Sequence, residues 1–194
     1  SDQSIILFGG GGPDTFVVSR RPDQLVGGRG SDTIEFLVNE AVTVRFDGIA
    51  NDGIAGQLLN VPSDVENVVG TAFEDLLIGD GARNELSGLA GHATIRGGGG
   101  DDNLLGGDGD DTLSGDGGDD SLDGGSGDDL YLYHQGEGRD VITDASGADT
   151  LRFGAGISDV ESGGALGANI RFGANMPLVE DQVGVRVSYM YNKI

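Results

Sequence analysis

The chain has 194 residues, 38 of them glycine, and carries 33 acidic against 11 basic side chains, a formal net charge of −22. Asp and Gly favour turns over helices, so this composition argues against an ordinary helical globule. The acidic balance makes nucleic acid and anionic membranes poor partners, and no apolar run is long enough for membrane insertion. Cysteine is absent, which removes disulfide and thiol chemistry. Two classes of protein remain compatible with this composition: a disordered acidic chain, and a turn-rich solenoid that binds cations.

The first element along the chain is a nine-residue unit that combines glycine, aspartate and an apolar residue. Residues 9–17 read Gly-Gly-Gly-Gly-Pro-Asp-Thr-Phe-Val, and residues 27–35 read Gly-Gly-Arg-Gly-Ser-Asp-Thr-Ile-Glu. Both units have Gly at position four, Asp at position six and an apolar residue at position eight. A glycine-free unit between them keeps Asp23 and Leu25 at the matching positions. We therefore predict an amino-terminal repeat block over residues 1–35.

Residues 36–69 break this register. The alternating segment 42–46, Val-Thr-Val-Arg-Phe, predicts a strand, and a turn-rich run follows it over residues 47–56. We interpret residues 36–69 as a spacer that contains β-strands.

Seven repeats then follow without interruption from residue 70 to residue 132. Position six is Asp in the last four repeats. In the first three it is Asp75, Asn84 and Ala93, so two of them depart from the pattern. After a two-residue slip at Tyr133-His134, the period resumes in repeats that begin at Gln135 and Asp144. The main repeat block is therefore predicted to cover residues 70–152.

Each unit can be read as a glycine-rich turn followed by a strand of about three residues, with position eight pointing inward. Two units make one 18-residue coil, so that alternate repeats stack on the same side and the core becomes continuous. Residues 153–194 hold further alternating segments at 170–172 and 183–191. We predict that they form a β cap over the open end of the solenoid, the alternative being a secretion signal or a partner edge.

The aspartates indicate what the turns bind. In this arrangement Asp102, Asp120 and Asp140 stack on one side at strand spacing of about 5 Å, and like charges at that distance repel. No Lys or Arg lies between Arg96 and Arg139 to neutralise them. Carboxylate and carbonyl oxygens without His or Cys are ligands for a hard cation, and irregular flexible turns suit Ca²⁺. A flexible Gly-Asp linker is the alternative, but the fixed spacing argues against it.

These units resemble the repeats-in-toxin (RTX) family of haemolysin-type calcium-binding repeats, whose pattern is Gly-Gly-x-Gly-x-Asp-x-U-x with U apolar. The resemblance implies an all-β fold, a parallel β-roll, in which each Ca²⁺ lies between two turns on the same side. Carried over to this sequence, it implies about five ions framed by carboxylate pairs. The pairs would be Asp14/Asp32, Asp102/Asp120, Asp111/Asp129, Asp120/Asp140 and Asp129/Asp149. Backbone oxygens would come mainly from Gly10, Gly12, Gly98, Gly100, Gly107, Gly109, Gly118, Gly125 and Gly127.

Three departures from the pattern weaken parts of this assignment. Ala93 removes a ligand, and Asn84 replaces an anion with a neutral oxygen. We expect the slip at Tyr133-His134 to distort the Asp120/Asp140 and Asp129/Asp149 sites. We expect a poor site between the turns that begin at Gly88 and Gly106.

The resemblance also implies a role. Such proteins are substrates of the type I secretion machinery of Gram-negative bacteria, and they fold on Ca²⁺ binding outside the cell or at its surface. We expect a module that stabilises a larger secreted protein or assists its secretion, and we expect no enzyme activity within these residues. The alternatives are the accessory portion of a secreted protease, lipase or polysaccharide-modifying enzyme, and a calcium-dependent adhesin or ligand-binding module. The exposed ends of a solenoid are strand edges that can pair with another copy.

The remaining polar and aromatic residues have simpler interpretations. His92 and His134 are expected on the surface or in packing, because the chain has neither His-Glu-x-x-His nor Gly-x-Ser-x-Gly. Tyr131 and Tyr133 are expected to pack within strands. The aspartates at position five are interpreted as solvated turn charges; they are Asp101, Asp110, Asp119 and Asp128.

Overall fold

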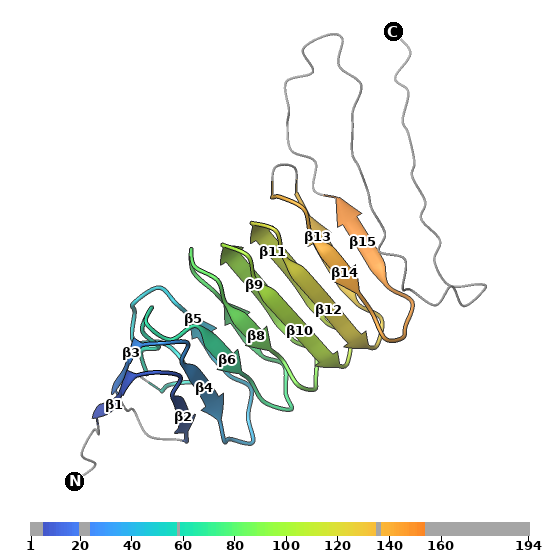
Figure 1. Cartoon of the computed structure of the whole chain (residues 1–194). Helices are drawn as coiled ribbons and strands as arrows, with labels where there is room; N and C mark the ends of the chain where they lie inside the picture. The colour runs from blue at the N-terminus through green and yellow to red at the C-terminus, as the bar shows by residue number, and fades with distance from the viewer. Residues whose placement is uncertain (1–5, 20–23, 58, 135–136, 154–194) are drawn as a thin grey trace, which may run out of the picture.

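The computed structural model describes residues 6–19, 24–57, 59–134 and 137–153. These residues form fifteen β-strands and no helix. The described part of the chain therefore contains no helix that could span a membrane. Figure 1 shows the strands following one another along a single axis, from β2 near the amino terminus to β15. Most of them belong to two parallel sheets.

The first sheet contains seven parallel strands in the order β14-β12-β10-β8-β6-β4-β2. Its strands are β2 (Thr15–Val18), β4 (Thr33–Phe36), β6 (Asn67–Val69), β8 (Glu85–Ser87), β10 (Asn103–Asp108), β12 (Ser121–Ser126) and β14 (Val141–Thr143).

The second sheet contains six parallel strands in the order β15-β13-β11-β9-β7-β5. Its strands are β5 (Thr43–Arg45), β7 (Leu76–Ile78), β9 (Thr94–Gly99), β11 (Thr112–Gly117), β13 (Leu130–Tyr133) and β15 (Thr150–Phe153). A small parallel pair, β1 (Ile6–Gly11) and β3 (Gln24–Arg29), forms a third sheet.

Register confirms the predicted coil. Leu104 of β10 pairs with Leu122 of β12, and Leu113 of β11 pairs with Tyr131 of β13, so paired residues lie 18 positions apart. From β6 onward, consecutive strands alternate between the first and second sheets. The fold is therefore an all-β parallel solenoid with two strands per coil, as the repeat period predicts.

In the repeats, the core is built from one inward side chain per nonapeptide. Position eight is buried, with no more than 6% of the residue exposed, in Phe16, Leu25, Ile34, Leu77, Leu86, Ile95, Leu104, Leu113, Leu122 and Tyr131. In the last two repeats, Ile142 and Leu151 are only partly buried. A single coil thus buries only two large side chains, which is too little to order its residues alone. Stacking of coils makes the thin core continuous.

The spacer contributes strands to both sheets although its sequence breaks the register. Residue Thr43 of β5 pairs with Leu76, and Thr33 of β4 pairs with Asn67 of β6. The coil at this point is 33 to 34 residues long, because the chain inserts a loop before it rejoins the stack. The buried carboxylate of Asp52 fastens that loop by accepting the N–H groups of two spacer residues.

The predicted strand length is right for some strands and wrong for others. Strands β7 and β8 span three residues, but β9 to β12 span six and run into the following glycines. In these coils the turns themselves pair, as Gly107 with Gly125. The strand continues because glycine permits two backbones to stack closely where the sequence suggests only a turn.

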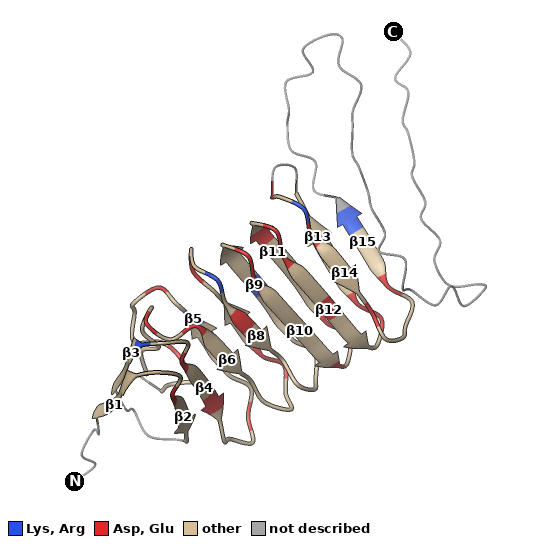
Figure 2. Ribbon diagram, in the orientation of Figure 1, with Lys and Arg blue, Asp and Glu red and all other residues tan. Residues whose placement is uncertain are grey.

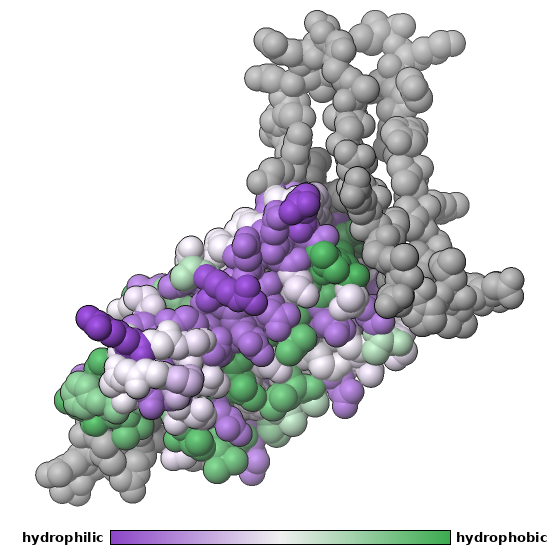
Figure 3. Space-filling model, in the orientation of Figure 1, coloured by the Kyte–Doolittle hydropathy of each residue, from purple (hydrophilic) through white to green (hydrophobic). Residues whose placement is uncertain are grey.

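The predicted carboxy-terminal β cap lies outside the described residues, since β15 ends at Phe153 and the description ends there. Asp23 and Gln135 of the irregular repeats also lie outside it. At the other end of the solenoid, the apolar side chains of Ile6 and Phe8 on β1 are 50% and 70% exposed. Figure 3 shows hydrophilic residues along the length of the face in view.

Candidate metal centre

The glycine turns stack so closely that no side chain fits between them. Gly98 has φ +103°, and a Cβ built on it would lie 2.2 Å from the carbonyl oxygen of Asp80 in the preceding coil. Gly118 has φ +144°, and its Cβ would lie 1.8 Å from the carbonyl oxygen of Gly100. Carbonyl oxygens of one coil therefore lie directly against the glycines of the next, and they line the gap between two turns.

All nine glycines predicted to supply backbone oxygens adopt positive φ: Gly10, Gly12, Gly98, Gly100, Gly107, Gly109, Gly118, Gly125 and Gly127. A substitution at any of them would strain the backbone. Gly10, Gly98, Gly107 and Gly125 lie at the ends of strands and the other five lie between strands. Their role as suppliers of backbone oxygens stays a prediction.

The residues at position six form two ladders along the solenoid. The first ladder precedes the strands of the seven-stranded sheet and consists of Asp14, Asp32, Glu66, Asn84, Asp102, Asp120 and Asp140. The second ladder precedes the strands of the six-stranded sheet and consists of Asp75, Ala93, Asp111, Asp129 and Asp149. All five predicted aspartate pairs are neighbours within a ladder. Figure 2 shows acidic residues recurring in the turns.

From the second coil onward, one oxygen of each ladder aspartate accepts a backbone N–H of the preceding coil. The Asp102 N–H donates to Oδ1 of Asp120 at 2.8 Å, and the Asp111 N–H donates to Oδ1 of Asp129 at 2.7 Å. The same bond crosses the slip, where Oδ1 of Asp140 accepts from the previous coil at 3.2 Å and that of Asp149 at 3.0 Å. The slip therefore preserves the ladder contact.

The other oxygen is buried and has no hydrogen-bond partner among the described residues. This is true of Oδ2 in Asp14, Asp32, Asp102, Asp111, Asp120 and Asp129. Five of these residues are at most 3% exposed: Asp32, Asp102, Asp111, Asp120 and Asp129. An isolated carboxylate oxygen away from water is costly unless a proton or a cation compensates it. The repeated orphan oxygen is the main chemical feature of both ladders.

The aspartate pKa values reflect this environment. Burial, reinforced by the negative charge of neighbouring aspartates, raises the pKa of Asp102 from 3.8 to about 7. The same causes raise the pKa values of Asp129 and Asp140 to about 6. Burial also raises the pKa values of Asp111 and Asp120. A divalent cation among these carboxylates would reverse the shift, because opposite charge favours the ionised form.

The departures from the repeat differ in their structural effect. Asn84 fits the ladder as a neutral residue, since its Oδ1 accepts the Asp80 N–H and its Nδ2 donates to the carbonyl oxygen of Glu66. Ala93 offers no side-chain oxygen, although its N–H still donates to Oδ1 of Asp111 at 2.7 Å. The second ladder therefore lacks a carboxylate at Ala93, the position where the sequence predicts a missing ligand.

Two further acidic residues, Asp75 and Asp144, lie outside the predicted carboxylate pairs. Asp75 is 2% exposed, but the N–H groups of Val42 and Thr71 and the Thr71 hydroxyl satisfy its oxygens. Asp144 lies with Asp129 and Asp149 in a group whose ligand atoms are within 4.8 Å of one another. It occupies position one, which is glycine in the regular repeats, so the pattern gave no signal for it.

Tyr131 orders that last group. Its side chain is buried, and its hydroxyl donates to Asp144 at 2.5 Å while accepting the Gly124 N–H at 2.8 Å. The expectation that Tyr131 packs within the strand is confirmed, with this added polar contact.

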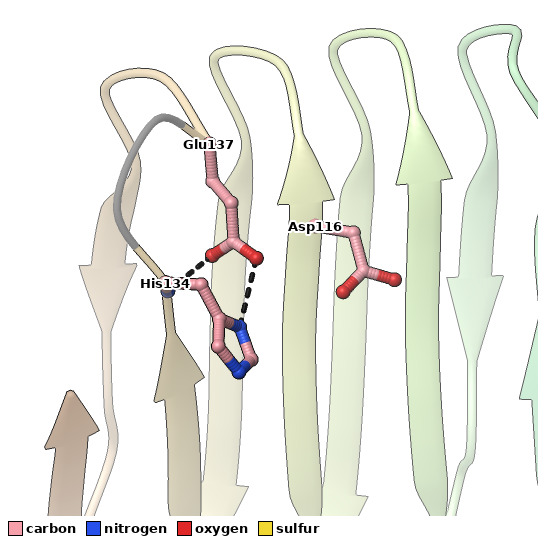
Figure 4. Close-up of side chains that lie close together, drawn as sticks. All are labelled: Asp116, His134 and Glu137. Carbon is pink, nitrogen blue, oxygen red and sulfur yellow. Dashed lines mark hydrogen bonds and ion pairs between the residues drawn. The ribbon is translucent and has the colours of Figure 1, made fainter. Parts of the chain in front are cut away.

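A different cluster lies on the flank of the solenoid, at Asp116, His134 and Glu137 (Figure 4). The His134 Nδ1 atom is 2.8 Å from Oε1 of Glu137, while the Asp116 carboxylate forms two hydrogen bonds of 3.0 Å with Arg96. His92, with 56% of its side chain exposed, contacts Asp110. Both histidines lie on the surface, as expected.

The position-five aspartates are exposed, in contrast to their position-six neighbours. Oδ1 of Asp101 accepts the Asp119 N–H at 2.9 Å, and Oδ1 of Asp110 accepts the Asp128 N–H at 2.9 Å. They fasten the outside of the turns while remaining in contact with solvent.

A parallel solenoid with stacked glycine turns and two ladders of orphaned carboxylates defines a class of protein, the cation-binding β-rolls. The RTX calcium-binding nonapeptide repeat matches the chain in four copies, over residues 7–36, 63–95, 96–131 and 136–159. Because these copies make up more than half of the sequence, the chain belongs to the RTX repeat family and is a calcium-binding β-roll module. Comparison with curated proteins finds no match.

Proposed function

We propose that this module is the calcium-dependent folding element of a larger secreted or surface protein of a Gram-negative bacterium. The chain stays loosely structured in calcium-poor cytosol, passes through a type I secretion machinery, and folds in calcium-rich surroundings. One observation carries the proposal: buried ladder aspartates, at most 3% exposed, keep an oxygen without a partner. At pH values where these aspartates are ionised, such a structure needs a cation to compensate them.

The ions lie between neighbouring turns of one ladder. We assign about five sites, to the pairs Asp14/Asp32, Asp102/Asp120, Asp111/Asp129, Asp120/Asp140 and Asp129/Asp149. The glycine carbonyl oxygens that line each gap complete the coordination, since Ca²⁺ takes six to eight oxygen ligands. Ca²⁺ fits better than Mg²⁺ because these turns offer many oxygens without octahedral geometry.

Charge couples binding to folding. Five divalent ions would offset about ten of the 22 net negative charges, and the two ladders together hold ten acidic residues. Without the ions, folding must bury repelling carboxylates or protonate them. With the ions, the same carboxylates become ligands, so that the free energy of binding contributes to folding.

Circular dichroism of the whole chain, titrated with CaCl₂ from a chelator solution, tests this proposal. We expect little β structure in chelator, followed by a cooperative gain of β signal as Ca²⁺ is added, and no comparable gain with Mg²⁺. A fully formed β spectrum in chelator at neutral pH would contradict calcium-dependent folding.

A further inference from the structure

The first ladder passes through the spacer at a turn that lacks the repeat pattern. Residues 62–66 read Pro-Ser-Asp-Val-Glu and contain no glycine. Nevertheless β4 pairs with β6 in register, with Thr33 opposite Asn67, so Glu66 stands opposite Asp32. Oε2 of Glu66 accepts the Asp32 N–H at 2.8 Å, which is the bond that an aspartate makes elsewhere in the ladder. Glu66 therefore takes the place of a position-six aspartate.

In the same turn, which has no glycine, Asp64 packs against the glycines of the preceding turn. Its Oδ2 accepts the N–H of Gly28 at 2.9 Å. A Cβ built on Gly27 would lie 1.9 Å from the backbone carbonyl oxygen of Asp64 and 2.8 Å from Oδ2 of Asp32. Both oxygens thus surround one point next to the turn.

The regular coils have the same arrangement. A Cβ built on Gly97 would lie 2.2 Å from Oδ2 of Asp102 and 2.7 Å from the carbonyl oxygen of Gly115. The Asp64 carbonyl oxygen therefore stands where a position-one glycine carbonyl stands in a regular pair of turns.

Two carboxylate oxygens at this junction have no partner among the described residues. Asp32 is fully buried with Oδ2 unpaired, and Oδ1 of Asp64 is also buried and unpaired. None of the ion pairs between described residues reaches Asp32, Asp64 or Glu66. Three carboxyl groups thus meet at one turn, and although Arg29 belongs to that turn, none of them is ion-paired with a basic side chain of the described residues.

We propose that a further Ca²⁺ binds at this junction, between the turn of residues 27–32 and the spacer turn of residues 62–66. Asp32 and Asp64 supply the carboxylate oxygens, the Asp64 carbonyl adds a backbone oxygen, and Glu66 positions the Asp32 turn. The inference rests on the proposed calcium-dependent folding. It adds a site that the nonapeptide pattern does not encode, and this ion joins the amino-terminal coils to the main stack across the long spacer loop.

The test uses Asp64→Asn in the whole chain, with Asp47→Asn as the matched control. Both changes remove one charge from the spacer and keep an oxygen acceptor, and Asp47 is exposed, where it caps the Ile49 N–H at 2.8 Å. Calorimetric titration with CaCl₂ should show one ion fewer per chain for Asp64→Asn and an unchanged number for Asp47→Asn.

Hydrogen exchange on the unmodified chain gives a second measurement that needs no variant. Added Ca²⁺ should protect the amides of residues 27–34 and 62–68 along with those of the main block. An unchanged ion count for Asp64→Asn, or Ca²⁺ protection of the main block alone, would overturn the junction site and leave the proposed function standing. Absence of Ca²⁺ binding by the unmodified chain would overturn both.

Discussion

Replacing Asp102 with Asn should change stability in opposite directions with and without Ca²⁺. Asp102 is 3% exposed, with Oδ1 bonded to the Asn84 N–H and Oδ2 unpaired. The preceding ladder residue, Asn84, shows that an amide fits this environment with its polar atoms satisfied. Asp102→Asn therefore removes a charge and keeps the shape.

The size of the effect follows from the pKa of Asp102, which burial raises from 3.8 to about 7. A shift of roughly three units corresponds to about 4 kcal/mol against the ionised form at pH 8. In chelator, Asp102→Asn should favour the folded state by up to that amount. In saturating Ca²⁺ the same change removes a ligand from the Asp102/Asp120 pair and should weaken binding.

The assay is folding followed by circular dichroism at pH 8. In chelator, the concentration of trimethylamine oxide needed to fold the chain should be lower for Asp102→Asn than for the parent, since osmolytes favour the compact state. Calorimetry should show fewer bound ions. Asp101→Asn is the control, because Asp101 is exposed beside the same turn and raises the pKa of Asp102 less than burial does. It should lower the osmolyte requirement far less than Asp102→Asn and leave the ion count unchanged. A higher osmolyte requirement, or an unchanged ion count, for Asp102→Asn would refute the reasoning.

Three further predictions follow from the same geometry. In chelator, acidification from pH 8 to pH 5 should increase β structure. The pKa of Asp102 in the folded state is raised to about 7, so protonation of Asp102 stabilises the folded state, and this stability is lost as pH rises through that value. Circular dichroism at constant chelator concentration measures the change, and a loss of β structure on acidification would contradict the prediction. Gly118→Ala should lower the Tm of the calcium-loaded chain, since its Cβ would lie 1.8 Å from a carbonyl oxygen, whereas Gly81→Ala, with open space around it, should not. Tyr131→Phe should lower the calcium-loaded stability by about 1 to 3 kcal/mol, measured by urea unfolding, because Asp144 loses a partly buried hydrogen bond and the buried Gly124 N–H loses its acceptor; equal stability would argue against these contacts.

The solenoid could be predicted from the sequence because a single period sets both the turns and the core. Leu104, Leu113 and Leu122 recur every nine residues and are all buried, so the apolar positions alone specify two strands per coil. The length of the strands was less predictable, because glycines that usually mark a turn here continue the parallel pairing. Such pairing depends on the neighbouring coil rather than on local sequence.

The pattern of acidic residues predicted most of the candidate site, and there are physical reasons why it did not predict the rest. The position-six aspartates between Arg96 and Arg139 stand out since no basic residue lies in that stretch. Asp64 and Glu66 escape the pattern because their turn lacks glycine, and only the register between β4 and β6 places them in the ladder. Asp75 matches the pattern, yet contacts from Thr71 and Val42 satisfy it, which the sequence does not show.

Anomalous diffraction from crystals of the calcium-loaded chain tests the central claim most directly. The account predicts peaks within the two ladders, between the carboxylates of Asp102 and Asp120 and between those of Asp111 and Asp129. Peaks confined to the flank at Asp116, His134 and Glu137, or no ordered ion beside the ladders, would contradict it.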